Sequence, residues 1–123
     1  IGIEAGTLVD MVQHHILGVA SSYADPLCQT IAHKKAAGVS CRTESALAAT
    51  VSTLCDSLMD RMLDLKTALQ NEPVCTQEDL VTYYHDTILA KMNAVRELID
   101  QLEQLVDKDY WPYPNYTELL FSV

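Results

Sequence analysis

Helical periodicity constrains the fold of this chain more than any other feature. Along most of its 123 residues, apolar side chains recur at steps of three and four positions. This spacing places them on one face of an α-helix, which turns once every 3.6 residues. The pattern covers residues 3–37, 43–71 and 77–108, and no stretch shows the Val, Ile and Thr alternation of a strand. The sequence predicts an all-α fold, an up-and-down bundle of three to four long antiparallel helices.

Each helical segment carries one apolar seam that must be covered by its neighbours. The first seam consists of Leu8, Val12, Ile16, Val19, Tyr23, Leu27 and Ile31. The second consists of Leu47, Val51, Leu54, Leu58, Met62, Leu65 and Leu69. The third consists of Val81, Tyr84, Ile88, Met92, Val95, Ile99, Leu102 and Val106. From Ile88 onward the steps alternate between four and three, a heptad spacing that favours near-antiparallel packing at about 20°.

Several residues mark where the helices begin and end. Inside a helix Pro26 removes one hydrogen bond and crowds the preceding turn, but a proline can also open a new helix. We therefore expect either a kink or a short break there, which leaves open whether the first segment is one helix or two. Gly38 is suited to end that segment, and Thr43 to cap the second. Pro73 prevents continuation of the second, and Thr76 begins a capping-box sequence.

Charge and composition exclude several classes of function. The formal net charge is −9, whereas proteins that bind nucleic acids or anionic membranes need clustered Lys and Arg. No apolar run approaches the roughly 18 to 20 residues of a membrane-spanning helix, and the N-terminus lacks a signal-peptide pattern. The chain begins with Ile1-Gly2 rather than Met, which suits a segment of a longer polypeptide. We expect a cytoplasmic protein that contacts neither nucleic acid nor membrane.

Cysteine usage agrees with a reducing compartment. Cys28, Cys41, Cys55 and Cys75 include no Cys-x-x-Cys pair, and Cys55 lies on an apolar helix face. A buried free cysteine behaves as a small hydrophobe. We expect reduced thiols, although the even number leaves a disulfide framework possible.

Few residues suggest chemistry. Asp10 and His14 stand four positions apart and could form a carboxylate-oriented histidine, or only a surface hydrogen bond. Asp56, Asp60 and Asp64 form a ridge that could hold a divalent cation or a basic partner, but such ridges are usually solvated faces. No phosphate-binding glycine loop or nucleophile motif is present. We predict no catalytic, cofactor-binding or metal-binding residue in this chain.

The final segment, residues 110–123, is stiff and apolar rather than polar and flexible. It follows a helical bundle over residues 1–109 and holds the single Trp and single Phe of the chain. Two prolines favour an extended path, and Asn115 is placed to cap a short terminal helix. Ordering such a segment without burial would only cost entropy. The predicted docking residues are Tyr110, Trp111, Pro112, Tyr113, Pro114, Tyr116, Leu119, Leu120 and Phe121. They could cover this bundle itself, or dock onto the rest of a parent chain or a neighbouring subunit.

The run from Tyr110 to Phe121 resembles the C-terminus of type III glutamine synthetases, which end in Tyr-Trp-Pro-aromatic-Pro-x-Tyr-x-acidic-Leu-Leu-Phe. The opening Ile3-Glu4-Ala5-Gly6-Thr7 is similar to that family's Ile-Glu-Ala-x-Thr helix, with Gly6 in place of an apolar residue. Ile16 to Ala20 lies where that family tends to have an Ile-Ile-Pro-Ala-Val run, with Gly18 in place of the proline.

The resemblance implies the C-terminal helical domain of a larger ligase. That parent enzyme would join ammonia to glutamate with ATP and Mg²⁺ or Mn²⁺, within ring-shaped homo-oligomers. Its ligands would lie upstream, so this chain would hold no cofactor and would pack against the catalytic region and neighbouring subunits. Two other hypotheses remain: a stand-alone helical interaction module, and a sensor or redox bundle that uses His14 or the cysteines.

Overall fold

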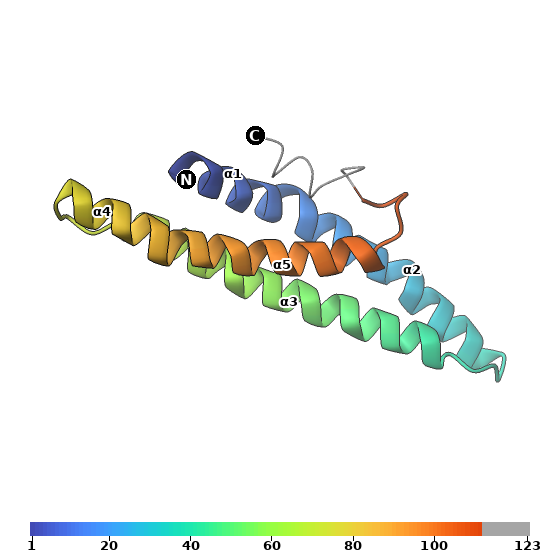
Figure 1. Ribbon diagram of the computed structural model, residues 1–123. Coiled ribbons are helices and arrows are strands. Elements are labelled where there is room, and N and C mark those ends of the chain that lie inside the picture. Colours follow the sequence, from blue (N-terminus) through green and yellow to red (C-terminus); the bar gives the residue numbers. More distant parts are fainter. Residues whose placement is uncertain (112–123) are drawn as a thin grey trace.

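The computed structural model describes residues 1–111, which form three long helices and contain no β-strand (Figure 1). The first long helix consists of α1 (Gly2–Met11), a π-helical turn η1 (Val12–Ile16) and α2 (Leu17–Ala36). The second is α3 (Arg42–Gln70). The third consists of α4 (Gln77–Tyr83), a second π-helical turn η2 (Tyr84–Ile88) and α5 (Leu89–Leu105). The predicted all-α fold is confirmed.

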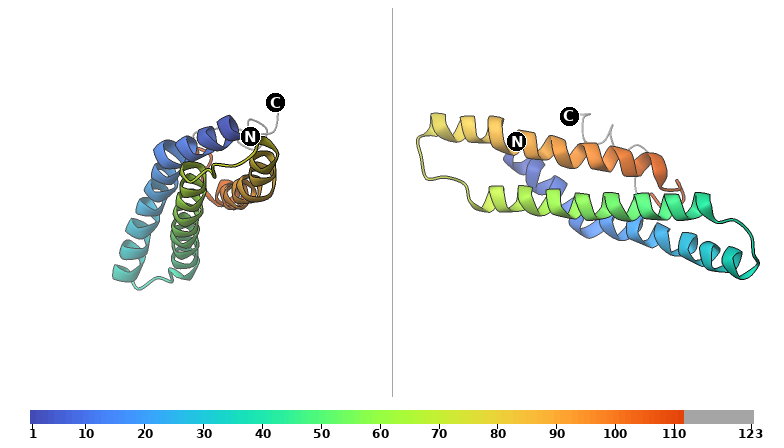
Figure 2. Two further views of the ribbon diagram at one scale, coloured as in Figure 1. Left: turned by 90° about the vertical axis from the view of Figure 1, so that its left-hand side faces the viewer. Right: turned by 90° about the horizontal axis from the view of Figure 1, so that it is seen from below.

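Helix α3 is the centre of the arrangement. It packs against α2 along one side and against α5 along another, and α1 contacts both α3 and α5. Short connections over residues 37–41 and 71–76 reverse the chain direction each time, because neither is long enough to cross the bundle. Figure 2 shows α3 and α5 running side by side, with the first long helix lying obliquely against them.

The core consists mainly of the predicted seams. Their fully or almost fully buried members are Leu8, Val12, Ile16, Val51, Leu58, Met62, Leu65, Ile88, Met92, Val95, Ile99, Leu102 and Val106. Ala5, Val9, Ala20 and Ala48 are also buried, although the seams did not include them. Val81 is an exception, with 64% of its surface exposed. It lies on α4, which extends beyond the part of the bundle that α1 covers (Figure 1).

The first segment is one continuous run of helical turns rather than two helices. α2 passes through Pro26 without interruption. Ser22, whose carbonyl loses its intrahelical partner to the proline, is exposed, so water can solvate that group. The irregular backbone lies instead at η1, which the sequence did not predict.

The ends of two helices follow the predicted chemistry. Gly38 has φ +71°, and the Val39 and Gly38 N–H groups donate to the Lys34 and Lys35 carbonyls over 2.8 and 3.2 Å. This is a Schellman motif, which requires the left-handed conformation that glycine adopts easily. Thr76 caps α4, because its hydroxyl accepts a 3.2 Å hydrogen bond from the Asp79 N–H.

Two predicted boundaries differ from the structure by more than one residue. The cap of α3 is Cys41 rather than Thr43, and the Ser45 N–H donates to the Cys41 carbonyl over 2.9 Å. The first turn of α3 thus forms earlier than the side-chain preference of Thr43 indicated. The third helix ends at Leu105 rather than 108, because Val106 adopts an extended conformation while its side chain stays buried.

Side-chain contacts fasten the hairpin at each turn. Lys34 at the end of α2 pairs with Glu44 at the start of α3. At the other turn the Tyr83 hydroxyl donates to the Ala68 carbonyl over 2.6 Å. A hydrogen bond with Glu72, together with burial, raises the pKa of Tyr84 beside it. These contacts join neighbouring helices near the short connections.

Candidate functional site

The predicted docking segment begins against the chain's own bundle. After α5, the Tyr110 and Trp111 N–H groups both donate to the Asp107 carbonyl, over 2.9 and 3.2 Å, which turns the chain back. The Tyr110 ring meets the Tyr23 ring edge-on, with centroids 5.4 Å apart. Trp111 is half-buried against the hydrophobic core. The first two docking residues therefore contact this bundle.

The other docking candidates lie outside the described residues. They are Pro112, Tyr113, Pro114, Tyr116, Leu119, Leu120 and Phe121. The terminal helix expected after Asn115 lies outside them too, so docking of this part stays a prediction.

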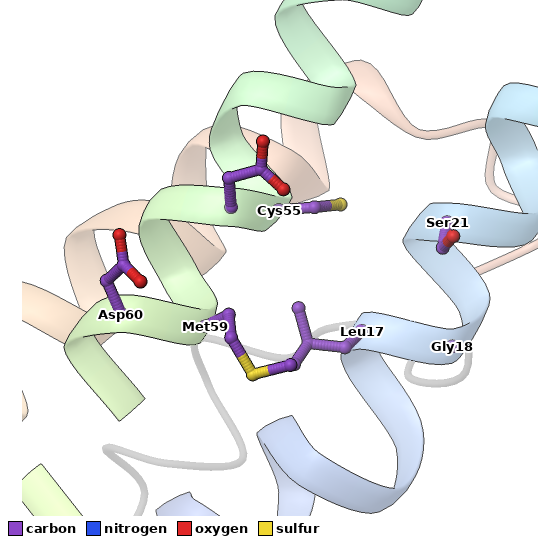
Figure 3. A pocket seen from close by; sticks show the side chains of 7 residues that line it. Leu17, Gly18, Ser21, Cys55, Met59 and Asp60 are labelled. Carbon is purple, nitrogen blue, oxygen red and sulfur yellow. The ribbon is translucent and has the colours of Figure 1, made fainter. Parts of the chain in front are cut away.

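A groove between α2 and α3 is the second candidate site (Figure 3). It has a volume of about 510 Å³ and is lined by Leu17, Gly18, Ser21, Cys55, Asp56, Met59 and Asp60. Gly18 and Ser21 are small, and a Cβ atom added at Gly18 would meet no atom within 4 Å. The two helices therefore leave space between them at this level. We call this space the α2–α3 groove.

The groove has an apolar interior and an acidic border. In Figure 3, Leu17 of α2 and Met59 of α3 reach towards each other across it, and Cys55 extends from α3 into the same space. Burial, and secondarily the charge of Asp56, raises the pKa of the Cys55 thiol. A thiol with a raised pKa stays protonated at neutral pH and is a poor nucleophile. The arrangement fits binding better than covalent chemistry.

The three aspartates of the predicted ridge lie in two different environments. Asp64 accepts a 2.6 Å hydrogen bond from Lys91 Nζ, which links α3 to α5. Asp56 and Asp60 instead border the α2–α3 groove and are exposed. Within residues 1–111, no group of three His, Cys, Asp or Glu side chains is arranged to hold a metal ion. The ridge is therefore not a cluster of three metal ligands.

The other reactive candidates are scattered over the surface. Asp10 and His14 are both exposed, and no hydrogen bond or ion pair joins them within the described part of the chain. His14 lies in η1, where the wider turn alters the usual alignment of positions four apart. The four cysteines are free, and Cys28 and Cys75 are exposed.

The sequence does not predict the groove, because two helices together form it. In the sequence, Gly18 stands out only as a departure from a family pattern, and Asp56 and Asp60 only as part of a ridge. The usable signal was a pair of small residues, Gly18 and Ser21, on the same side of one helix. Nothing in the sequence placed them opposite Met59.

Among residues 1–111, no helix is both long enough and apolar enough to cross a membrane.

The described part of the chain is thus a helical bundle with a groove and an aromatic turn. Comparison with known proteins shows that the chain is similar in sequence to glutamine synthetases. It is 29% identical over 129 residues to a glutamine synthetase of Butyrivibrio fibrisolvens, covering 100% of this chain and 18% of that protein. It is 25% identical over 128 residues to a glutamine synthetase of Bacteroides fragilis (strain YCH46), covering 98% of this chain and 17% of that protein.

A third relative is a type-3 enzyme. A type-3 glutamine synthetase of Dictyostelium discoideum is 35% identical over 52 residues, which is 42% of this chain and 7% of that protein. The chain is homologous along its length to a region of glutamine synthetases, a type-3 enzyme among them. It spans less than a fifth of the length of these relatives, 18% of the first. No protein-family model matches the chain, and no solved structure shows a significant match.

Proposed function

We propose that this chain is the C-terminal structural and assembly domain of a type-3 glutamine synthetase. The parent enzyme would make glutamine from glutamate, ammonia and ATP, with Mg²⁺ or Mn²⁺, in the cytoplasm. This domain alone would not catalyse the reaction. Its partners would be the catalytic region of its own chain and neighbouring subunits of a homo-oligomeric ring, and neither nucleic acid nor membrane.

The observation that carries this proposal is the homology itself. It covers 100% of this chain but only 18% of the Butyrivibrio glutamine synthetase, as expected for one region of a larger enzyme. The raised pKa of Cys55 argues against a nucleophile at the groove. The well-packed core of the bundle among residues 1–111 fits a structural role.

The aromatic terminal segment would do the docking. Tyr110 and Trp111 use this bundle as their support, and we propose that Tyr113, Leu120 and Phe121 reach the catalytic region or an adjacent subunit. Burial of one large apolar side chain contributes about 1.5–3 kcal/mol. A few such side chains would hold an interface between subunits.

The test is truncation of the full-length enzyme that contains this segment. A variant that ends after Asp109 should lose ring assembly in analytical ultracentrifugation, and with it ammonia-dependent ligase activity. A second variant, Leu120→Ser/Phe121→Ser, keeps Tyr110 and Trp111 and should weaken assembly without unfolding the bundle, as circular dichroism would show. Val74→Ser, at an exposed residue between α3 and α4, is the matched control and should assemble normally. Unchanged rings and activity after truncation would remove the proposal.

A stand-alone helical interaction module is the second candidate. Its support is the exposure of Met59 and Leu63, at 45% and 48%, on one side of α3. Such side chains often mark sites of protein contact. If the chain binds a partner helix equally well with and without the longer polypeptide, and the truncation above has no effect, this candidate replaces the first.

A further inference from the structure

We propose that the α2–α3 groove binds a basic amphipathic helix from outside this chain. The occupant would place an apolar side chain against Leu17 and Met59 and direct Lys or Arg side chains to Asp56 and Asp60. This inference uses the shape and charge of the groove. It does not depend on the role proposed above for the terminal segment.

The apolar part of the surface is larger than the groove. Cys55, Met59 and Leu63 follow one another at four-residue steps on α3, so they form a stripe along one face of that helix. The core stripe, with Leu58 and Met62 fully or almost fully buried, occupies a different face. Met59 and Leu63 therefore remain about half exposed within the described structure and offer apolar area that a partner helix could cover.

The shape suits one inserted side chain rather than an enclosed small molecule. Because Gly18 and Ser21 are small, the α2 side of the groove has no bulky side chain at these positions. The groove volume of about 510 Å³ is open to solvent along the helices. Small-molecule sites usually bury most of the ligand surface. A helix laid along α2 and α3 would cover the open side, with one apolar side chain in the groove and its neighbours three or four positions away on Met59 and Leu63.

The charge of the border specifies the chemistry of the occupant. Asp56 and Asp60 stand four positions apart on α3, and both border the groove. Lys and Arg carry long apolar stems that can lie on Leu17 and Met59 while the charged ends reach the carboxylates. Charge complementarity of this kind steers association and sets register. An apolar helix bordered by Lys or Arg is therefore the matching partner.

Two other occupants fit less well. A second copy of this chain carries the same net charge of −9, so charge repulsion opposes pairing of two such surfaces. The chain's own residues 112–123 include Glu118 and no Lys or Arg, so they cannot supply the cations. An external basic helix satisfies both the apolar and the acidic parts of the surface.

The direct test uses the whole 123-residue chain and a defined probe. The probe is a designed peptide of about 18 residues, long enough to form a helix, with leucines in one stripe and flanking lysines on an alanine background. We expect saturable binding by fluorescence anisotropy, with NMR shift changes centred on Leu17, Cys55 and Met59. The same peptide with glutamate in place of lysine should not bind. Equal binding of both peptides, or shift changes centred elsewhere, would overturn the proposal.

Two pairs of variants separate charge from shape. Asp56→Asn/Asp60→Asn should weaken binding of the lysine peptide about three- to ten-fold, the range for two partly exposed ion pairs. Asp10→Asn/Glu97→Gln removes the same charge from exposed helical sites elsewhere and should change binding less than about two-fold. Gly18→Leu should fill the groove and abolish most binding, whereas Gly6→Leu on α1 should not. Circular dichroism would check that each variant remains folded. If both members of either pair bind the lysine peptide with equal affinity, the proposal is wrong.

Two further NMR measurements show whether a different occupant fills the groove. Shift changes at Met59 that depend on protein concentration, without peptide, would assign the groove to a second copy. Changes at Leu17 and Met59 caused by Leu120→Ser/Phe121→Ser would assign it to the chain's own terminal segment. Either result would overturn an external basic helix.

Discussion

At the residue scale, the ion pair between Lys34 and Glu44 shows how charge placement reinforces a turn. Lys34 lies in the last turn of α2 and Glu44 in the first turn of α3. Each charge is favourable at its own helix end, because the helix dipole is negative at the C-terminus and positive at the N-terminus. The Lys34 hydrogen bond, followed by a backbone hydrogen bond, lowers the pKa of Glu44 from its ordinary value of 4.5.

This lowered pKa predicts a pH dependence of stability. A carboxyl with a lower pKa in the folded state contributes stability above its unfolded pKa, and this contribution is lost as the pH falls through the folded value. Glu44→Gln should therefore lower the free energy of unfolding at about pH 7 and leave it nearly unchanged at about pH 2, where both forms are neutral. Urea unfolding at the two pH values would measure this. Lys34→Met removes the partner of Glu44 and should also lower the free energy of unfolding at neutral pH. If Glu44→Gln lowered the free energy of unfolding equally at both pH values, the ionised Glu44 carboxylate would not be the source of the stability.

At the element scale, local backbone geometry decides the course of the long helices. η1 and η2 interrupt the first and third helices, yet Val12, Ile16 and Ile88 within them are fully buried. A π turn holds an additional residue and so rotates the following helix relative to the preceding one. The two turns therefore adjust the directions of the apolar stripes on either side while the core stays continuous.

Glycines at two positions should respond in opposite ways to the same substitution. Gly18→Ala should stabilise the fold by about 0.5–1 kcal/mol, because alanine favours a helix and the added Cβ meets open space. Gly38→Ala should destabilise it by about 1 kcal/mol or more, because φ at that position is +71°. Thermal unfolding followed by circular dichroism would measure both. A stabilising Gly38→Ala would contradict the Schellman motif at the end of α2.

At the scale of the whole molecule, α3 organises the bundle and the aromatic turn after α5 links its outer helices. Tyr110 follows the third helix but its ring meets Tyr23 of α2. Trp111 packs on the same core that Leu58 and Ile99 form. The end of the chain's helical part is thereby attached to α2, which supports the view that Tyr110 and Trp111 form the base of the docking segment.

Removal of the Trp111 side chain should measure this attachment. Trp111→Ala should lower the free energy of unfolding by roughly 1–2 kcal/mol, since a fully buried large apolar side chain contributes about 1.5–3 kcal/mol and Trp111 is half-buried. Trp111→Phe should recover most of the loss. Urea denaturation followed by circular dichroism gives both values. A loss below about 0.3 kcal/mol would mean that Trp111 packs on the bundle without stabilising it.

The class of the fold and most of the core can be read from the spacing of residues along the chain. Repeated spacing of Leu, Ile, Val and Met identifies the buried faces because that spacing reflects the turn of a single helix. Thr76 and Gly38 mark ends for the same reason, since caps and Schellman motifs involve residues close in sequence. The relationship to glutamine synthetases also follows from residue order alone.

How the apolar faces meet is set by contacts between helices that are distant in sequence. The exposure of Val81, the groove opposite Gly18 and the pairing of Asp64 with Lys91 all depend on where one helix lies against another. The π turns are equally invisible to a pattern of residues, because their extra residue is accommodated by packing across the bundle. Periodicity records which side of a helix is apolar, whereas contact between distant residues is set by the balance of packing over the whole molecule.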